Sequence, residues 1–238
     1  MQRVEQALAR SKEAMVRDMF AQIAPTYDLL NTLLSFNIHH GWRRAALSDA
    51  CLTPEARVLD LATGTADLAI GAARQCAQVV GADFCAPILR LGQAKTRRQR
   101  QTSITFALAS ADHLPFADNS FDAVVMGFAL RNVPSTQRAL AEMARVTKPG
   151  GWVVNLDLTR PVRPWLRPLY RFYQDLLMPF VGGLISGRRE AYTYLPKSIQ
   201  GFPPPEEIAE VFRAAGLAEV SFRPLSGGLA TIHRGRKP

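Results

Sequence analysis

The sequence is poor in cysteine and contains no long uninterrupted apolar run. Its 238 residues include three cysteines, at positions 51, 76 and 85, and none belongs to a Cys-x-x-Cys pair. A disulfide framework, a thiolate metal site and a redox dithiol are therefore disfavoured, and a reducing compartment is expected. The longest uncharged apolar stretch, residues 176–187, is interrupted by proline and glycine and is too short to span a bilayer.

Acidic residues are also scarce. The 20 Asp and Glu residues stand against 29 Lys and Arg, which gives a formal net charge of +9 and favours an anionic partner or surface. Arginines gather at 97–100, at 234–236 and across 160–189, where a single acidic residue accompanies them. A solvated basic face explains each cluster on its own, and the apolar residues among the arginines fit an anionic membrane surface. No RNA-binding module accompanies these clusters, so nucleic acid is not the expected partner.

The pattern along the chain predicts one α/β domain. An N-terminus without an apolar h-region argues against a signal peptide. Residues 1–50 read as a helical cap with Ser11 as its first N-cap, a break at Pro25 and a second helix up to residue 50. Strands are expected at 57–62, 78–83, 103–108, 121–126 and 152–158, with helices at 67–77, 87–95 and 135–147 between them. This alternation predicts a mostly parallel, Rossmann-like sheet with right-handed crossovers.

The rest of the chain departs from this alternation. A helix from Pro205 that stops at Gly216 precedes a hairpin of residues 219–223 and 229–233, which would add an antiparallel strand. We therefore divide the domain 1–238 into a helical cap (1–50), a cofactor-binding core (51–158), an inserted substrate lid (159–204) and a C-terminal helix and hairpin (205–238).

The first strand ends in a turn that is typical of nucleotide-like cofactors. Gly64 permits positive φ and close backbone approach, and Asp83 ends the second strand at a position that suits two ribose hydroxyls. A nicotinamide dinucleotide is the competing ligand, and a glycine required only by the turn is the structural alternative. Asp67 disfavours a pyrophosphate and suits the amino group of S-adenosylmethionine. Ser110 and the Ala111 backbone follow the third strand, where an adenine pocket is expected.

Several longer motifs resemble the UbiE/MenG/COQ5 family of quinone-biosynthesis C-methyltransferases, which have a class I methyltransferase fold. The similarity runs nearly end to end, and its most specific motifs are Ala24 to Asn31, Leu130 to Val133 and Tyr194 to Ile199. The further matching positions are Met19, Phe20, Leu34, Ser35, His39, Trp42, Arg43, Leu114 to Phe116, Phe128, Ala129, Tyr192, Phe202, Pro203, Gly227, Gly228 and His233.

The resemblance implies S-adenosylmethionine as cofactor, no metal, and a lipid quinol as the substrate that is methylated on a ring carbon. Its implied cofactor contacts are Thr65, Asp83, Ser110 and Ala111, with Gly127 nearby. Three residues depart from the family pattern. Ala66 stands in place of a usual glycine, Ser110 in place of Asp or Asn, and Gly127 in place of the serine of some members.

Four side chains are candidates for the chemistry. Arg131 and Asn132 follow the fourth strand, where substrate would meet cofactor, and they are assigned phenolate stabilisation and orientation of a quinol oxygen. His39 is a candidate base because an ordinary histidine titrates near neutrality, and a helix cap is its alternative role. The resemblance also places Tyr27 over the site. Demethylmenaquinol is the favoured substrate, and a benzoquinol precursor of ubiquinone is not excluded by the motifs.

The lid is expected to hold the lipid tail. Tyr194, Phe172 and Phe180 are the assigned substrate-binding residues. Arg163, Arg167 and Arg171 alternate with residues such as Trp165 in a pattern like that of an interfacial helix on anionic lipid. Core packing explains many of the lid's apolar residues equally well. We therefore expect a cytoplasmic protein at the inner face of the membrane.

Three other functions fit parts of the sequence. The first is a methyltransferase for another apolar small molecule, such as a polyketide or a sterol. The second is a non-catalytic scaffold subunit of a quinone-making complex, which the substitutions at 66, 110 and 127 would suit. The third is an RNA methyltransferase, which only the net charge suggests. A homodimer is compatible with the sequence.

Overall fold

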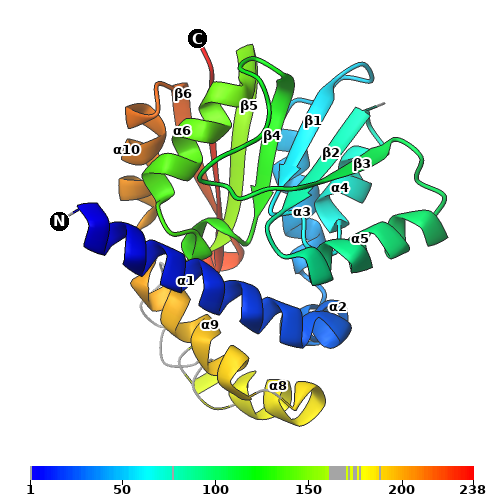
Figure 1. The fold of residues 1–238 in the computed structure, drawn as a ribbon, viewed down its shortest axis with the longest axis vertical. Helices are drawn as coiled ribbons and strands as arrows, with labels where there is room; N and C mark the ends of the chain where they lie inside the picture. The colour runs from blue at the N-terminus through cyan, green and yellow to red at the C-terminus, as the bar shows by residue number, and fades with distance from the viewer. Residues whose placement is uncertain are drawn as a thin grey trace.

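A seven-stranded sheet forms the centre of the computed structural model, which describes residues 2–76, 78–160, 170, 172–173, 176, 178–187 and 189–238 (Figure 1). Its strand order is β3-β2-β1-β4-β5-β7-β6. The strands are β1 (Arg57–Leu61), β2 (Gln78–Asp83), β3 (Ile104–Leu108), β4 (Phe121–Gly127), β5 (Thr147–Leu158), β6 (Ala218–Leu225) and β7 (Ala230–Arg236). The pairs among β1 to β5 are parallel, and β7 pairs antiparallel with both β5 and β6. The predicted fold class is confirmed, and the hairpin places its second strand inside the sheet and its first strand at the edge.

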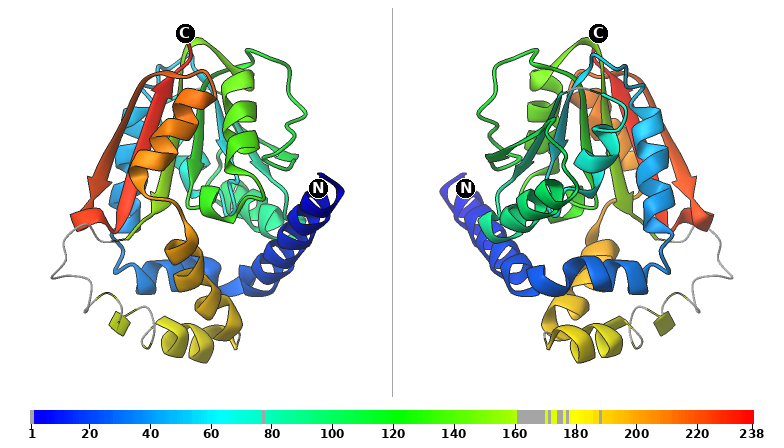
Figure 2. Two further views of the ribbon diagram at one scale, coloured as in Figure 1. Left: turned by 90° about the vertical axis from the view of Figure 1, so that its left-hand side faces the viewer. Right: turned by 90° about the vertical axis from the view of Figure 1, so that its right-hand side faces the viewer.

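Helices cover both faces of the sheet. Those before the fourth strand are α1 (Gln2–Ile23), η1 (Ala24–Thr26), α2 (Tyr27–Leu34), α3 (His39–Asp49), α4 (Asp67–Ala72) and α5 (Ala86–Arg98). Those after it are η2 (Leu130–Asn132), α6 (Thr136–Val146), α8 (Met178–Ser186), α9 (Arg189–Gly201), α10 (Pro205–Ala214) and η5 (Ser226–Gly228). An apolar cluster joins α3 and α4 to one face, and a second joins α6 and α10 to the other (Figure 2).

The element boundaries differ from the predictions where local signals were misleading. Ser11 is not an N-cap: α1 already begins at Gln2, because no helix-breaking residue occurs before Ser11. The predicted second helix around Trp42 is α3, and a further helix, α2, precedes it, separated by Phe36 and Asn37 with positive φ. The helix after the first turn ends at Ala72 rather than near residue 77. Ser135 does cap α6, where its hydroxyl accepts a hydrogen bond from the Arg138 backbone N–H.

The chain order reverses between β1 and β4, so the carboxyl ends of these strands border a crevice. Helices α1, α2, α8 and α9 lie across this end of the sheet, at the bottom of Figure 1. The described helices of the predicted lid, α8 and α9, therefore lie at the end of the sheet that holds the predicted cofactor site. Within the described residues, no helix combines the length and apolarity needed to cross a membrane. The interfacial pattern around Trp165 and the arginines at 163, 167 and 171 lies outside the described residues.

Candidate active site

Two neighbouring cavities lie at the carboxyl ends of the parallel strands. The first is lined by Gly64, Asp83, Ser110, Ala111 and Gly127, and is closed above by side chains of α1 and α2. The second is largely apolar and lies between the N-terminal helices, η2 and α9. Phe20, Tyr27, Phe128 and Asn132 line both cavities.

The turn after β1 has an unusual backbone. Ala62, Gly64 and Ala66 have φ values of 57°, 56° and 68°, so two alanines adopt a conformation that favours glycine. Asp60 holds the turn from below, because its Oδ2 accepts hydrogen bonds from the Thr63 hydroxyl at 2.6 Å and the Ala69 N–H at 2.8 Å. Burial raises the pKa of Asp60 to about 7. Its Oδ1 is buried without a hydrogen-bond partner, which leaves one acceptor unused beneath the turn.

Asp83 lies where the sequence predicts a ribose-binding carboxylate. Its Oδ2 accepts the Gly64 N–H at 2.8 Å and its Oδ1 accepts the Cys85 N–H at 2.9 Å. Each oxygen retains a further lone pair, so the carboxylate can accept from two neighbouring hydroxyls. Burial raises the pKa of Asp83 to about 6, and the backbone N–H groups partly oppose this. It is therefore mostly ionised at neutral pH.

Two of the departures from the family pattern have a visible packing context. Ala66 is fully buried, and a Cβ built on Gly92 of α5 would lie 3.4 Å from the Ala66 methyl group. A Cβ built on Gly127 would lie 2.5 Å from Leu68 Cδ1, so Leu68 fills the space that a serine at 127 would need. Neither substitution removes a group that lines the first cavity. Ser110 and Ala111 remain at its edge, as the adenine-pocket prediction requires.

Thr65 and Asp67 lie beside the first cavity and not among its lining residues. The Thr65 hydroxyl donates to Asp28 Oδ1 at 2.6 Å, which ties the turn to α2. Asp67 forms ion pairs with Lys95 and with Arg43, whose Nη1 lies 3.3 Å from Asp67 Oδ2. The predicted contact of Asp67 with an amino group of the cofactor is not supported by this placement, because two cations already neutralise the carboxylate.

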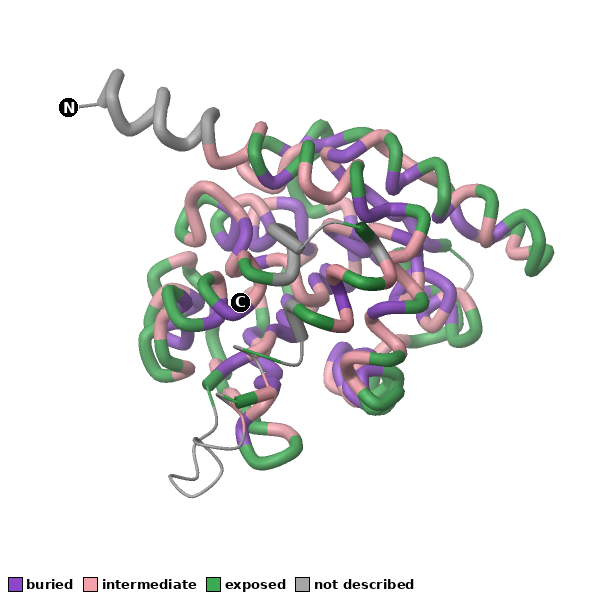
Figure 3. The backbone as a smooth tube through the Cα atoms, turned by 90° about the horizontal axis from the view of Figure 1, so that it is seen from below, coloured by how far each residue is buried: buried purple, intermediate pink, exposed green. Residues whose placement is uncertain are grey.

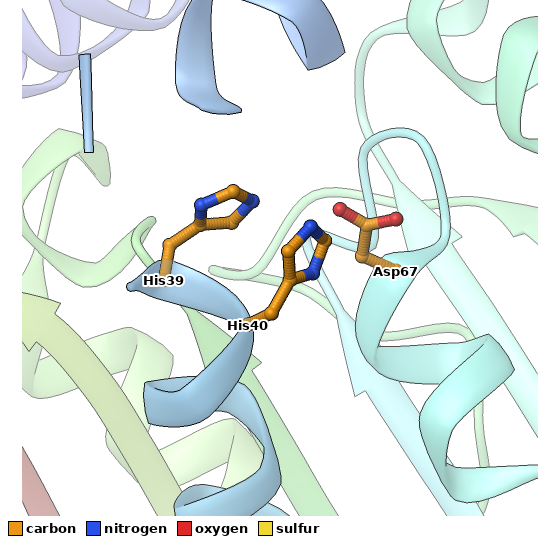
Figure 4. A group of neighbouring side chains, drawn as sticks. All are labelled: His39, His40 and Asp67. Atoms are coloured by element: carbon orange, nitrogen blue, oxygen red, sulfur yellow. The ribbon is translucent and has the colours of Figure 1, made fainter. Parts of the chain in front are cut away.

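His39, His40 and Asp67 form the cluster in Figure 4, in which His40 lies between the other two. Their ligand atoms lie within 4.8 Å of one another, which is close enough to consider a metal ion. Arg43 and Lys95, however, compete for the only carboxylate of the cluster. Because these cations would repel a divalent ion, the arrangement suits an ion-pair network better than a metal centre.

Arg131 is fixed in the wall of the second cavity. Its Nη1 lies 2.5 Å from Asp157 Oδ1, and its backbone N–H donates to Asp157 Oδ2 at 3.0 Å. The same Nη1 donates to the Phe128 carbonyl oxygen at 2.5 Å, and Nε donates to the Ser198 hydroxyl at 3.3 Å. Both side chains of the ion pair are buried. The guanidinium is therefore a positioned cation at the cavity wall, and its role in stabilising an anionic oxygen stays a prediction.

Asn132, Tyr194 and Tyr27 surround the region that the cavities share. Asn132 is buried, and its Oδ1 accepts a hydrogen bond from the Tyr194 hydroxyl at 3.3 Å. This bond orients the amide so that its NH₂ group remains available for a substrate oxygen. Burial raises the pKa of Tyr27 and of Tyr194, so both phenols stay protonated and can act as hydrogen-bond donors.

His39 is buried at the start of α3 and lines the second cavity. The Ser35 hydroxyl lies 2.6 Å from the Asn31 carbonyl oxygen and 2.5 Å from His39 Nδ1, and when it donates to Asn31 it accepts from His39 Nδ1. This places a lone pair on His39 Nε2. Burial, aided by the positive charge of Arg43, lowers the pKa of His39 to about 4. The expectation that His39 titrates near neutrality is therefore wrong.

The structure places two predicted substrate-binding residues away from both cavities. Phe172 and Phe180 are 59% and 65% exposed, and neither lines a cavity described above. Tyr194, by contrast, lines the second cavity, and its contact with a substrate stays a prediction.

The sequence argument missed four residues of the site: Asp28, Asp60, Asp157 and Phe128. Asp60 and Asp157 are single carboxylates inside otherwise apolar strands, a pattern that was visible in the sequence. Phe128 separates the two cavities and receives the Arg43 guanidinium 5.3 Å from its ring centre. Asp28 lies in the motif Ala24 to Asn31, but its role could not be assigned, because its partners Thr65 and Lys95 are distant in sequence.

The residues present fit S-adenosylmethionine. The buried carboxylate at the end of β2 would receive the ribose, and the positive-φ turn would pass close to the methionine part of the ligand. The cavity edge at Ser110 and Ala111 would receive the adenine.

Solved structures with this architecture include methyltransferases. A [4+2]-cyclase, SpnF, superposes with a TM-score of 0.70 at 16% identity, over 94% of this chain and 95% of that one. A possible histamine N-methyltransferase from Thermotoga maritima superposes with a TM-score of 0.64 at 20% identity, over 93% and 99%. Identities this low establish the fold alone, and the cyclase illustrates that one fold supports different reactions.

Sequence relatives are far more similar. A demethylmenaquinone methyltransferase of Thermus thermophilus is 44% identical over 222 residues, which are 92% of this chain and 100% of the relative. A ubiquinone/menaquinone biosynthesis C-methyltransferase, UbiE, of Haemophilus ducreyi is 39% identical over 230 residues, 95% and 89% of the two chains. The model of the ubiE/COQ5 methyltransferase family matches residues 8–237. The resemblance seen in the motifs is thereby confirmed: this chain is a member of the ubiE/COQ5 methyltransferase family.

Proposed function

We propose that this chain transfers the methyl group of S-adenosylmethionine to a ring carbon of demethylmenaquinol. The observation that carries the proposal is the pair of adjoining cavities, one with the ribose-type carboxylate Asp83 and one apolar with the fixed cation Arg131. The names of the relatives from Thermus thermophilus and Haemophilus ducreyi support a quinol substrate. A benzoquinol precursor of ubiquinone is the second candidate, which the name of the Haemophilus relative favours.

When bound, the cofactor supplies an electrophilic methyl group, and the chain has to hold a nucleophilic carbon in line with it. The shared wall of Tyr27, Phe128 and Asn132 is where the two ligands would meet. Aligning two bound reactants lowers a barrier by about 7–11 kcal/mol. The Asn132 amide, held by Tyr194, would orient one oxygen of the quinol ring.

Arg131 would make the ring carbon more nucleophilic by stabilising the phenolate form of the quinol. Asp157 keeps the guanidinium in place, so no reorganisation is needed as the oxygen becomes anionic. His39 Nε2 carries a lone pair, but the low pKa of this imidazole, about 4, makes it a weak base. Transfer from a phenol of pKa near 10 to such a base costs about 8 kcal/mol. Phenolate stabilisation by Arg131 therefore carries more of the mechanism than base action by His39.

The first test is calorimetric binding of S-adenosylmethionine to the wild type and to Asp83→Ala. We expect binding by the wild type and at least about a tenfold loss in the variant, because two ribose hydroxyls lose their acceptor. Methyl transfer to demethylmenaquinol and to the benzoquinol is then compared, with Arg131→Lys as the variant that keeps the charge and loses the fixed fork. A folded wild type that does not bind the cofactor would refute the proposal and favour a scaffold. Cofactor binding without transfer to either quinol would favour a different apolar substrate.

A further inference from the structure

The first cavity contains a carboxyl group that the proposed mechanism does not use. Among the described residues that line it, two carry a carboxyl group, Asp83 and Glu13, and none is a lysine, an arginine or a histidine. Asp83 accepts two backbone N–H groups and suits the ribose. Glu13 belongs to α1, and within the described part of the chain its side chain forms no ion pair and no hydrogen bond. A half-buried carboxylate in a cavity without a cation suits a hydrogen-bond donor on the ligand.

Helix α1 closes the first cavity and is fastened on two sides of it. The Lys12 Nζ donates to the Val133 carbonyl oxygen at 2.7 Å, and the Cys85 thiol donates to the Arg17 carbonyl oxygen at 3.6 Å. Val133 and Cys85 both line the cavity. Glu13 follows the first attachment point directly and precedes the second, so α1 holds its side chain at the cavity.

One side of α1 is directed into the cavity. Glu13, Val16 and Phe20 line it, and their spacing of three and four residues places them on one side of a helix. Val16 is buried, whereas Asp18, on the opposite side, is exposed. Figure 3 shows this change between buried and exposed positions along α1. Glu13 is thus an acidic residue on the inner side of a closing helix.

Glu13 lies at the end of the cavity where the adenine is expected. Asp112 follows Ser110 and Ala111 in the loop after β3; burial raises the pKa of Asp112, and the negative charge of Glu13 adds to the rise. Glu13 therefore lies close to this loop. Asp112 itself does not line the cavity, whereas Ser110 and Ala111 do. The loop thus offers this end of the cavity a hydroxyl and backbone groups, and the carboxylate comes from α1.

We propose that Glu13 accepts a hydrogen bond from the 6-amino group of the adenine of S-adenosylmethionine. Ser110 stands where the family pattern has Asp or Asn, so α1 would restore an acceptor that the loop lacks. Adenine has a donor at this position, whereas hypoxanthine has an oxygen, which a carboxylate repels. An acceptor on α1 also links recognition of the base to closure of the cavity. The inference rests on the proposed cofactor.

The test is calorimetric binding of three ligands to the full-length protein. S-adenosylhomocysteine carries the adenine, S-inosylhomocysteine has an oxygen in place of the 6-amino group, and methylthioadenosine lacks the amino-acid part. Glu13→Met keeps the length and the helix propensity of the side chain and removes the acceptor. The matched control, Asp18→Ala, removes an acidic side chain, 65% exposed, from the opposite side of α1. The double variant Glu13→Met/Ser110→Asp returns a carboxylate to the loop.

We expect the wild type and the control to bind S-adenosylhomocysteine at least about tenfold more tightly than the inosyl ligand. Glu13→Met should bind S-adenosylhomocysteine and methylthioadenosine about tenfold more weakly than the wild type does, with no loss for the inosyl ligand. Retained binding of the inosyl ligand shows that the variant is folded. The double variant should recover the preference for adenine.

Three results would overturn the inference and leave the proposed function in place. The wild type, which needs no substitution to be tested, might bind the adenine and inosyl ligands equally. Glu13→Met could lose the same factor for both, which would make the residue structural only. A loss that methylthioadenosine does not share would place Glu13 at the amino group of the methionine part. A folded wild type that binds none of the three ligands would instead refute the proposed function.

Discussion

The contact between α5 and the turn after β1 can be tested with Gly92→Ala, which adds a single carbon atom. An added Cβ would lie 2.9 Å from the Gly64 carbonyl oxygen and 3.3 Å from the Thr65 carbonyl carbon. Both neighbours are backbone atoms of the turn, so the overlap can be relieved only by moving the turn or α5. Overpacking of this kind costs about 1–3 kcal/mol.

Helix propensity acts in the opposite direction. Replacing a glycine by alanine inside a helix stabilises it by about 0.5–1 kcal/mol. Gly41 of α3 provides the matched control, since nothing lies within 4 Å of the Cβ that alanine would add there. We expect Gly41→Ala to raise the free energy of unfolding by that amount, and Gly92→Ala to lower it by up to about 2 kcal/mol.

Urea unfolding measures both stabilities, and calorimetry measures S-adenosylmethionine binding. Because Gly64 lines the first cavity, Gly92→Ala should also weaken cofactor binding by about tenfold, a loss of 1.4 kcal/mol. The reasoning is refuted if Gly92→Ala is as stabilising as Gly41→Ala and binds the cofactor like the wild type.

Three further substitutions test the carboxylates around the site. Asp157→Asn breaks the ion pair with Arg131, so it should lower the free energy of unfolding by about 3 kcal/mol, which urea unfolding measures. It should also reduce kcat with little change in the KM for the cofactor, which steady-state kinetics measure. Asp60, whose pKa is raised to about 7, keeps a proton that the unfolded chain releases, so stability is lost as pH rises through about 7. Asp60→Asn should remove about 1 kcal/mol of this loss between about pH 6 and 8 in thermal unfolding. Asp28→Ala, which frees Thr65 and Lys95, should accelerate cofactor dissociation several-fold in stopped-flow measurements.

Each of these predictions has a distinguishing control. Asp122→Asn breaks a partly exposed pair with Lys148 at the other end of the sheet and should cost only about 1 kcal/mol, with kcat unchanged. If Asp157→Asn behaves like it, Asp157 does not position Arg131. Equal pH profiles for Asp60→Asn and the wild type would contradict a buried, protonated Asp60. Unaltered dissociation in Asp28→Ala would mean that α2 does not retain the cofactor.

The sequence predicted the sheet well because buried strands leave a strong signal. Strand ends located Asp83 and Arg131 correctly, since carboxyl ends of parallel strands converge at one edge. Helix boundaries were less accurate, because a possible cap such as Ser11 also occurs inside helices. The positive φ values of Phe36 and Ala66 were not predicted, since phenylalanine and alanine rarely adopt this conformation, although the turn that contains Ala66 was predicted.

The sequence did not predict the direction in which individual side chains point. Thr65 and Asp67 lie in the predicted turn, yet they face Asp28 and Lys95 instead of the first cavity. Their partners come from helices that are distant in sequence, so only the tertiary arrangement decides between the two directions. The same holds for His39, whose burial beside Arg43 lowers its pKa to about 4, well below that of an ordinary histidine.

Under the proposed function, the wall shared by the two cavities would couple the binding of the cofactor to the binding of the quinol. Phe20, Tyr27, Phe128 and Asn132 border both sites, so any shift that improves the fit of one ligand also reshapes the site of the other. Thermodynamic reciprocity then requires that the quinol change the affinity for the cofactor by the same factor by which the cofactor changes the affinity for the quinol. In the proposed reaction the cofactor loses its methyl group and the quinol gains it. One reaction therefore changes the affinities of both sites, through the same four side chains.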